Sequence, residues 1–285
     1  TLSPVSSRNT SSARRRHHAP MCRFLAYAGD PILLEDLVCK PSHSLVKQSL
    51  SAVQARTVTN GDGFGIGWYG ERPEPGVYRE VMPAWSDENL LSLCANVRSR
   101  CFLAHVRAAT GGGIARQNCH PFHHGRYMLI HNGQIGGYAK LRRTLEGQLP
   151  DALFEHRRGA TDSELLFLLI VQQLDAGLSA PKAIQHVLGS TLQAMQQAGI
   201  DEPLRFAAAL TDGTTLWAIR WASDDQPPSL YTKPQAGGWA IASEPLGDDS
   251  EHWTPMAPGQ VVRVSGGGDG EGGVRGAELC ELDRR

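Results

Sequence analysis

Hydrophobic residues recur along this chain with two periods, which predict two kinds of element. Apolar positions three or four residues apart predict helices, and short apolar runs bounded by turn residues predict strands. The predicted helices cover residues 44–54, 87–98, 161–174 and 181–197. The predicted strands cover residues 22–28, 64–69, 101–107, 127–131, 206–210, 215–221, 230–232, 239–242 and 260–264. This order predicts an α+β protein with layered sheets and helices outside them.

Capping and turn residues predict where several elements end. Ser86 is the expected N-cap of one helix, and Thr161 and Glu164 have the spacing of a capping box at the start of another. Gly29-Asp30-Pro31 predicts a turn that closes the first strand, and Asp212-Gly213 predicts a hairpin.

The chain of 285 residues is expected to form one domain with an extension at each end. Residues 1–21 are rich in Ser and Arg and hold few large apolar side chains, so they are expected to be disordered. They are interpreted as a flexible extension or as sequence upstream of the natural start, with a transit peptide as the alternative. Residues 22–264 form the predicted domain, and residues 265–285 form a Gly-rich tail.

Composition narrows the expected partners and compartment. The 28 basic and 29 acidic residues nearly cancel, and only Arg14-Arg15-Arg16 concentrates positive charge, so nucleic acid is not an expected partner. The six cysteines are scattered in a chain too long to need disulfides, which favours a reducing, cytoplasmic compartment. No apolar run reaches the roughly 18–20 residues of a transmembrane helix, so no membrane association is expected.

The candidate chemistry starts at Met21-Cys22, where the predicted order begins. Removal of Met21 and everything before it would give Cys22 a free α-amine. An amine with a pKa of about 8 beside a thiol of about 8.5 supplies a built-in base for a sulfur nucleophile. Taken alone, a cysteine in a first strand is more often a small buried residue.

Four downstream motifs change that balance: His105-Val106-Arg107-Ala108-Ala109-Thr110, Cys119-His120-Pro121-Phe122, His131-Asn132-Gly133 and Thr161-Asp162-Ser163-Glu164. In this order and spacing, the chain from about residue 21 to residue 264 resembles the class II glutamine amidotransferases, which are N-terminal-nucleophile hydrolases. The resemblance is specific because several motifs recur in order. It implies a four-layer αββα sandwich that cleaves a γ-glutamyl amide and releases glutamate, with no cofactor and no metal.

Further stretches narrow the resemblance within that family: MCRFLAYAG, PSHSLVKQS, NGDGFGIGWYG and ATDSE. They look most like the glutamine-amidotransferase-like subunit of the fungal glutathione-degradation complex and its bacterial relatives. The ergothioneine-pathway γ-glutamyl amidohydrolases are a near branch. The implied substrate is a small γ-glutamyl compound, glutamine or a γ-glutamyl peptide. No acceptor domain is left over in the chain, so hydrolysis is expected, and a partner peptidase or acceptor subunit stays open.

The resemblance implies a role for five residues. Cys22 attacks the δ-carbonyl and forms a γ-glutamyl thioester, while its α-amine carries the proton. Asn132, by its side-chain amide, and Gly133, by its backbone N–H, form the oxyanion hole. Arg107 holds the α-carboxylate, and Asp162 pairs with the α-ammonium. Each role has a plainer alternative. Asn132-Gly133 would be a turn after a strand, Arg107 an exposed charge at a strand end, and Asp162 an acid at a helix start.

Other residues are expected around these five. Thr110 and His120 fall in the family motifs and are expected to line or support the pocket. The Asp62-Gly63 segment opens a strand with alternating glycines, which allow close backbone approach, and is expected to pack beside Cys22. The candidates for the leaving-group pocket are residues 41–49, Trp68, Trp85 and residues 111–118.

Two alternatives belong to other classes of function. One is a zinc-binding module, although its residues match no recognised finger spacing: Cys119, His120, His123, His124 and His131. The other is a catalytically silent or regulatory glutamine-binding subunit of the same fold, because an uncleaved chain has no free amine at Cys22.

Overall fold

The computed structural model describes residues 22–51, 59–109, 112–235, 237–247, 250–265 and 278–281. Within these ranges the strands form two antiparallel sheets. The first sheet has the spatial order β11 (Thr254–Pro255), β9 (Tyr231–Gln235), β10 (Gly238–Ala242), β1 (Arg23–Leu33), β4 (Arg98–Val106), β2 (Phe64–Trp68) and β3 (Gly76–Glu80). The second has the order β13 (Glu278–Glu281), β12 (Gln260–Ser265), β8 (Thr215–Ala222), β7 (Leu204–Thr211), β6 (Tyr127–Ile135) and β5 (Phe122–His124).

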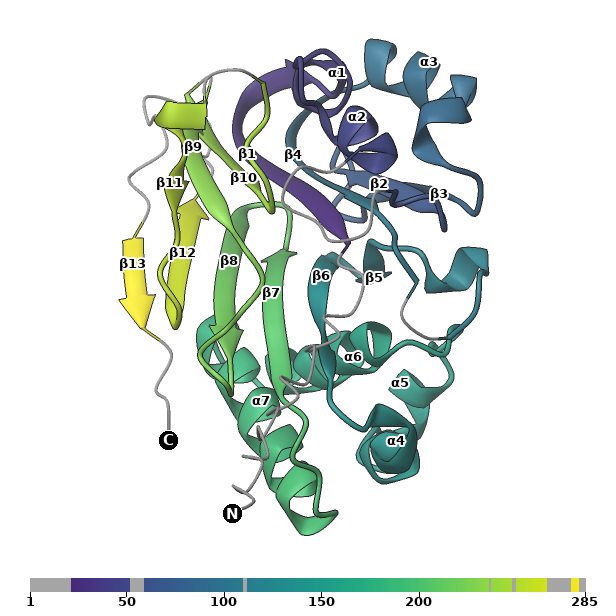
Figure 1. Ribbon diagram of the computed structural model, residues 1–285, viewed down its shortest axis with the longest axis vertical. Coiled ribbons are helices and arrows are strands. Elements are labelled where there is room, and N and C mark those ends of the chain that lie inside the picture. Colours follow the sequence, from purple (N-terminus) through teal and green to yellow (C-terminus); the bar gives the residue numbers. More distant parts are fainter. Residues whose placement is uncertain are drawn as a thin grey trace, which may run out of the picture.

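Helices cover the outer faces of both sheets. The first sheet is covered by α1 (Glu35–Val38), α2 (Leu45–Leu50) and α3 (Glu88–Asn96). The second is covered by α4 (Tyr138–Glu146), α5 (Asp151–Phe154), α6 (Asp162–Asp175) and α7 (Ala180–Gln197). Figure 1 shows the two helical layers at opposite ends of the stack, with α1–α3 at the top and α6 and α7 at the bottom. Short 3-10 turns lie at Ala84–Ser86, Arg116–Asn118 and Ser250–His252.

Strand alternation explains why four layers form. In β1, Phe24 and Ala26 face the second sheet, whereas Leu25 and Tyr27 pack under α1–α3. In β6, even-numbered residues such as Ile130 lie between the sheets, and odd-numbered residues such as Leu129 pack against α6 and α7. Successive side chains in a strand point to opposite faces, so both sheets bury both faces. Three apolar cores between four layers confirm the predicted αββα sandwich.

Two predicted element ends are wrong. The first strand does not stop at Gly29-Asp30-Pro31, because β1 continues through a bulge in its pairing with β4, and the Tyr27 hydroxyl donates to the Asp30 carbonyl oxygen at 2.7 Å. The N-cap of α3 is Asp87, whose carboxylate accepts the Leu90 N–H at 2.7 Å, while Ser86 donates to the Pro83 carbonyl. In both places a local side-chain contact decides the geometry.

The predicted capping box forms only in part. The Thr161 hydroxyl accepts the Glu164 N–H at 3.2 Å, as expected for an N-cap. The Glu164 carboxylate accepts from the Arg158 and Gly159 N–H groups at 2.9 and 2.7 Å, which fixes the loop before α6. Glu164 therefore stabilises the loop before α6 and does not bond back to the N-cap residue, as a complete capping box would require.

Several predictions concern the two ends of the chain. Residues 1–21 and most of the predicted tail lie outside the described residues, as do residues 52–54 of the first predicted helix. Two parts of the predicted tail are described: Ser265 ends β12, and residues 278–281 pair with β12 as β13. In the described ranges, no helix combines the length and the apolar character that crossing a membrane requires.

Candidate active site

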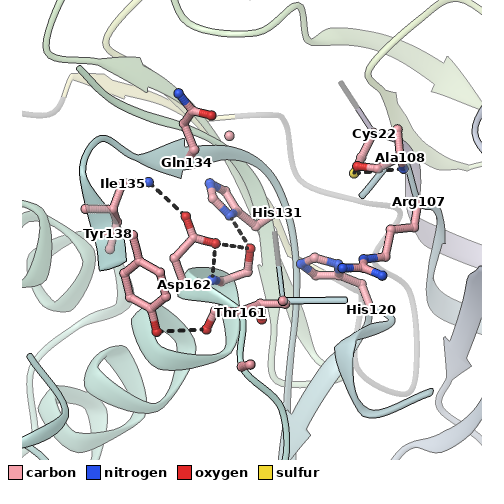
Figure 2. A pocket seen from close by; sticks show the side chains of 14 residues that line it. Cys22, Arg107, Ala108, His120, His131, Gln134, Ile135, Tyr138, Thr161 and Asp162 are labelled. Carbon is pink, nitrogen blue, oxygen red and sulfur yellow. Dashed lines mark hydrogen bonds between the residues drawn. The ribbon is translucent and has the colours of Figure 1, made fainter. Parts of the chain in front are cut away.

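A pocket of about 160 Å³ lies where the start of β1 and the end of β4 meet β6 and the start of α6 (Figure 2). Its lining comprises Cys22, Arg107, Ala108, Gly112, His120, His131, Gly133, Gln134, Ile135, Tyr138, Ala160, Thr161, Asp162 and Ser163. The volume lies below the roughly 300–1,000 Å³ of pockets for drug-sized ligands, so it suits a group of amino-acid size.

The pocket brings together most of the predicted site residues. Cys22, Arg107, His120, Gly133 and Asp162 all line it. Asn132 precedes Gly133 in β6 and is buried next to the lining. Thr110 lies outside the described residues.

Strand alternation places the sulfur and the guanidinium on the inner face. Cys22 continues the row of Phe24, which faces the space between the sheets, and Arg107 continues the row of Leu103 on the neighbouring strand β4. Because β1 and β4 are antiparallel, the start of one lies beside the end of the other, with Arg23 opposite Val106. Two residues far apart in sequence therefore meet at one end of the sandwich.

Cys22 is a half-buried residue, and among the described residues its sulfur makes only long contacts. Its Sγ atom lies 3.4 Å from the Ala108 nitrogen, which donates to it, and 3.5 Å from the Ala108 carbonyl oxygen. Burial of the sulfur raises the pKa of the Cys22 thiol, and this outweighs the opposing influence of the Ala108 amide and Arg107. The neutral thiol is therefore the favoured form.

The Asp62-Gly63 segment packs against the strand end beside Cys22. The Arg107 N–H donates to the Gly63 carbonyl at 2.8 Å, and the Asp62 N–H donates to the Arg107 carbonyl at 3.1 Å. The Asp62 carboxylate then accepts the Ala109 N–H at 2.8 Å. These bonds fix the backbone of Ala108, which contacts the sulfur.

Arg107 is not the exposed strand-end charge of the plainer interpretation. Only 4% of the residue is exposed. One guanidinium nitrogen, Nη1, donates to the Gly113 carbonyl oxygen at 2.9 Å. The pocket wall thus carries a buried, oriented positive charge, which Figure 2 shows on the same side of the pocket as Cys22 and His120.

Asn132 and Gly133 do not form a turn. Both lie inside β6, where they pair with Ala207 and Phe206 of β7. A Cβ atom on Gly133 would collide with the Arg205 carbonyl oxygen, so only glycine fits between these strands.

Asn132 is buried, with 3% of the residue exposed. Its Nδ2 donor has no hydrogen-bond partner among the described residues. An unpaired buried donor costs about 1–3 kcal/mol. Such a donor calls for an explanation, and a catalytic role is one of them.

Asp162 is held in place by main-chain donors. It is the first residue of α6, and its two carboxylate oxygens accept the Ile135 and Ser163 N–H groups, each at 2.8 Å. These bonds join the end of β6 to the start of the helix. The helix-start interpretation and a binding role are therefore compatible.

His131 lies in the same wall. Its Nε2 atom lies 3.2 Å from the Arg205 carbonyl oxygen, and its Nδ1 atom lies 2.8 Å from the Ser163 hydroxyl. A carbonyl only accepts, so Nε2 carries the proton and Nδ1 accepts from Ser163. Burial lowers the pKa of His131, which favours this neutral ring.

Two further buried imidazoles stack near the strand ends. The His105 and His120 ring centroids are 4.1 Å apart, and His120 lines the pocket. Burial, with a smaller contribution from Arg107, lowers the pKa of His105 to about 3, and burial lowers that of His120 well below its usual value. Both rings are neutral at pH 7.

The residues of the zinc alternative are engaged elsewhere. The Cys119 sulfur lies near the Glu80 carbonyl oxygen, and the His124 ring packs edge-on against His156. Within the described ranges, no group of three Cys, His, Asp or Glu side chains is arranged to hold a metal ion. The geometry gives the zinc-binding module no support.

Some lining residues were not predicted, and most of the residues predicted for the leaving-group pocket lie outside this lining. Gln134 and Tyr138 line the pocket, whereas Trp68, Trp85 and residues 41–49 do not. Of residues 111–118, the described part contributes Gly112 to the lining. Gln134 follows the His-Asn-Gly motif directly, which is the signal that could have found it.

Tyr138 follows β6 at the start of α4, a helix that the hydrophobic pattern did not predict. Its hydroxyl accepts from Arg157 Nη2 at 2.7 Å and lies 3.4 Å from the Thr161 carbonyl oxygen. These contacts fix the wall of the pocket beside Asp162.

The fold and the site define a class of protein, and known structures and sequences similar to this chain belong to the same class. A solved structure of a glutamine aminotransferase class-II domain protein from Silicibacter pomeroyi superposes with a TM-score of 0.68 and 34% identity, covering 92% of this chain and 100% of that chain. The family model described as glutamine amidotransferases class-II matches residues 33–226, which is more than half of the chain. The chain belongs to the class II glutamine amidotransferases.

Two curated relatives cover most of the chain. The gamma-glutamyl-hercynylcysteine sulfoxide hydrolase of Mycolicibacterium smegmatis is 31% identical over 246 residues, covering 86% of this chain and 96% of that protein. The probable glutamine amidotransferase DUG3 of Saccharomyces cerevisiae is 29% identical over 291 residues, covering 86% of this chain and 82% of that protein.

Proposed function

We propose that this chain hydrolyses the γ-amide bond of a small γ-glutamyl compound, glutamine or a γ-glutamyl peptide, and releases glutamate. The observation that carries the proposal is one pocket of amino-acid size lined by a thiol, a buried guanidinium and an oriented carboxylate, from Cys22, Arg107 and Asp162. These are the groups needed to attack an amide and to hold a zwitterionic glutamyl group. The name of the mycobacterial relative, a γ-glutamyl hydrolase, supports the same bond type.

Binding and attack follow from the charges of the pocket. Arg107 pairs with the substrate α-carboxylate and Asp162 with its α-ammonium, so that the δ-carbonyl faces Cys22. The Cys22 sulfur adds to that carbon and forms a tetrahedral oxyanion. The Nδ2 donor of Asn132, unpaired in the described structure, and the Gly133 N–H stabilise the negative oxygen. The amine then leaves with a proton, and water cleaves the thioester to glutamate.

The proton of the thiol needs an acceptor, because the pKa of Cys22 is raised. Both ring nitrogens of His131 are engaged, and the lowered pKa of His120 makes its ring a weak base. The α-amine that appears when residues 1–21 are removed has an ordinary pKa of about 8 and is a stronger base. This contrast supports an N-terminal nucleophile mechanism.

The test begins with a chain that starts at Met21. Its intact mass reports whether Cys22 becomes the first residue, and glutamate release is measured with glutamine, glutathione, a γ-glutamyl dipeptide and a γ-glutamyl thioether. Cys22→Ala is expected to lower turnover by about 10⁴-fold or more. The matched control, Cys39→Ala, removes a half-buried free thiol outside the pocket and should keep full turnover.

Two outcomes would contradict the proposal. Equal glutamate release by Cys22→Ala would exclude the nucleophile. A chain that begins at Cys22, binds glutamine and yet releases glutamate from no substrate would favour the regulatory alternative. A partner that uses the released ammonia or peptide, and a cytoplasmic location, stay predictions.

A further inference from the structure

On the face of β1 opposite the pocket, a buried arginine holds the main chain of Cys22. Arg23 belongs to the row of Leu25, which packs beneath α1–α3, so its side chain points away from the space between the sheets. Its Nη1 atom donates to the Cys22 carbonyl oxygen at 3.0 Å. Its Nε atom donates to a carboxylate oxygen of Glu244 at 2.9 Å.

The contact continues from Glu244 to the surface. The other carboxylate oxygen of Glu244 lies 2.7 Å from His43 Nε2, which carries the proton because a carboxylate only accepts. The His43 side chain is 24% exposed. Gln48 ties the two segments together, because its amide donates to the His43 carbonyl at 3.0 Å and lies 3.4 Å from that of Glu244.

Burial of this ion pair is costly and calls for a reason. Arg23 is 0% exposed and Glu244 is 2% exposed. Removing two charges from water costs several kcal/mol per ion, and a well-packed apolar pair is often as stable. Stability alone therefore does not explain why the residue after the nucleophile is a fully buried arginine.

We infer that Arg23, Glu244 and His43 form a chain of hydrogen bonds that fixes the position of the nucleophile, and we call this chain the positioning relay. The inference rests on the proposed function. A first residue has a peptide bond on one side only, so its main chain is held by fewer constraints than that of any later residue. The bond from Arg23 to the Cys22 carbonyl restricts rotation of that residue. It thereby fixes the sulfur and the α-amine relative to the bound carbonyl, while Glu244 and His43 hold the guanidinium.

The test uses two variants, each with a matched control. Arg23→Lys keeps the charge but cannot reach both the Cys22 carbonyl and Glu244 with one forked group. Arg220→Lys is its control, because Arg220 likewise donates to carbonyl oxygens, those of Pro228 and Met256, and lies outside the pocket lining. His43→Asn breaks the outer end of the relay, and His186→Asn changes an exposed histidine on α7.

The measurements are KM and turnover per active site, with sites counted by covalent titration with an electrophilic glutamine analogue. Arg23→Lys is expected to lower turnover per site by about 10- to 100-fold, because a displacement near 1 Å can cost about 10²-fold. His43→Asn is expected to lower it about 3- to 10-fold. KM should change by less than about threefold, since Arg107 and Asp162 are untouched, and both controls should match the wild type.

A merely structural role would reduce the number of titrated sites and leave turnover per site unchanged. That result for both variants would overturn the relay. If Arg23→Lys does not fold, His43→Asn decides, because its side chain reaches the surface. Failure of the proposed function is distinguishable, because the wild type would then release no glutamate or Cys22→Ala would be equally active.

Discussion

The two walls of the pocket differ in how completely their polar groups are bonded. In the wall formed by β6 and α6, the Asp162 carboxylate accepts two main-chain N–H groups and both nitrogens of His131 are engaged. In the wall formed by β1 and β4, the contacts of the Cys22 sulfur with described residues are the long ones to Ala108, and burial raises the pKa of its thiol. One wall is already organised, and the other holds a neutral thiol whose ionised form is disfavoured by burial.

This difference matches a division between binding and reaction. A carboxylate fixed by two donors loses little entropy when it pairs with a ligand, which is the benefit of preorganisation. A thiol with few contacts can move toward an electrophile without first breaking strong bonds. Asn132 is the exception in the organised wall, because its Nδ2 donor has no partner among the described residues.

Apart from Cys22→Ala, the largest loss of turnover is expected from a change at Asn132. Asn132→Ala should lower turnover by about 10²- to 10³-fold, because an oxyanion donor is lost, while KM changes little. The free energy of unfolding should be unchanged or raised, because no hydrogen bond of this donor is removed. Steady-state kinetics and urea denaturation provide the measurements. Asn96→Ala on α3, whose amide donates to the Ser92 carbonyl, is the control, and a variant with normal turnover would remove Asn132 from the oxyanion hole.

A smaller effect, mainly on binding, is expected from Asp162→Asn. The neutral side chain loses its attraction for an α-ammonium, and kcat/KM should fall about 10- to 100-fold, the equivalent of a charged hydrogen bond, chiefly through KM. Asp87→Asn is the matched control, since Asp87 also accepts a main-chain N–H at a helix start, remote from the pocket. If Asp162→Asn kept the wild-type KM, as the control should, then the wall formed by β6 and α6 would not be the one that binds the substrate.

Asp62 does not line the pocket, and its replacement should affect turnover through the backbone that contacts Cys22. Asp62→Ala frees the Ala109 N–H and so loosens the backbone that contacts the sulfur. Turnover is expected to fall about 5- to 10-fold, within the loss that misplacement can cause. The free energy of unfolding should fall by about 1.5–3 kcal/mol. Asp36→Ala, which frees the Leu33 N–H on the far side of the first sheet, should lower stability without changing turnover.

The last prediction concerns stability in acid and not turnover. His105 is buried with a pKa of about 3, against 6.5 in the unfolded chain, so the unfolded state takes up its proton first as the pH falls. The stability due to the neutral ring is complete above pH 6.5 and is lost progressively between about 6.5 and 3, by at most about 1.4 kcal/mol per pH unit. His105→Gln should show a shallower loss than the wild type between pH 7 and 5 in urea denaturation. An equal slope in both proteins would place the titration elsewhere.

Hydrophobic periodicity predicted layered sheets with helices outside them, whereas the four-layer order and the set of site residues came from the resemblance of the motifs to a family. Sequence patterns failed where tertiary contacts override local preference. Asn132-Gly133 has the composition of a turn, but pairing with β7 keeps it extended. Helix α4 was missed because Leu141 and Leu145 are its only fully buried apolar residues, which is too few for a clear period. The leaving-group side stays a prediction, because Trp68 and Trp85 lie outside the lining of the pocket described here and the loop paths around them are not encoded in a local pattern.

The position of β6 in the centre of the site has a consequence for how this sequence can change length. Within a few residues the strand sends His131 to one side and Asn132 to the other, and both faces are buried. A single inserted or deleted residue between Met128 and Gly133 would exchange the two faces and separate the donor from the sulfur. This part of β6 therefore tolerates neither an insertion nor a deletion, whereas the exposed connection at residues 70–74 can change its length.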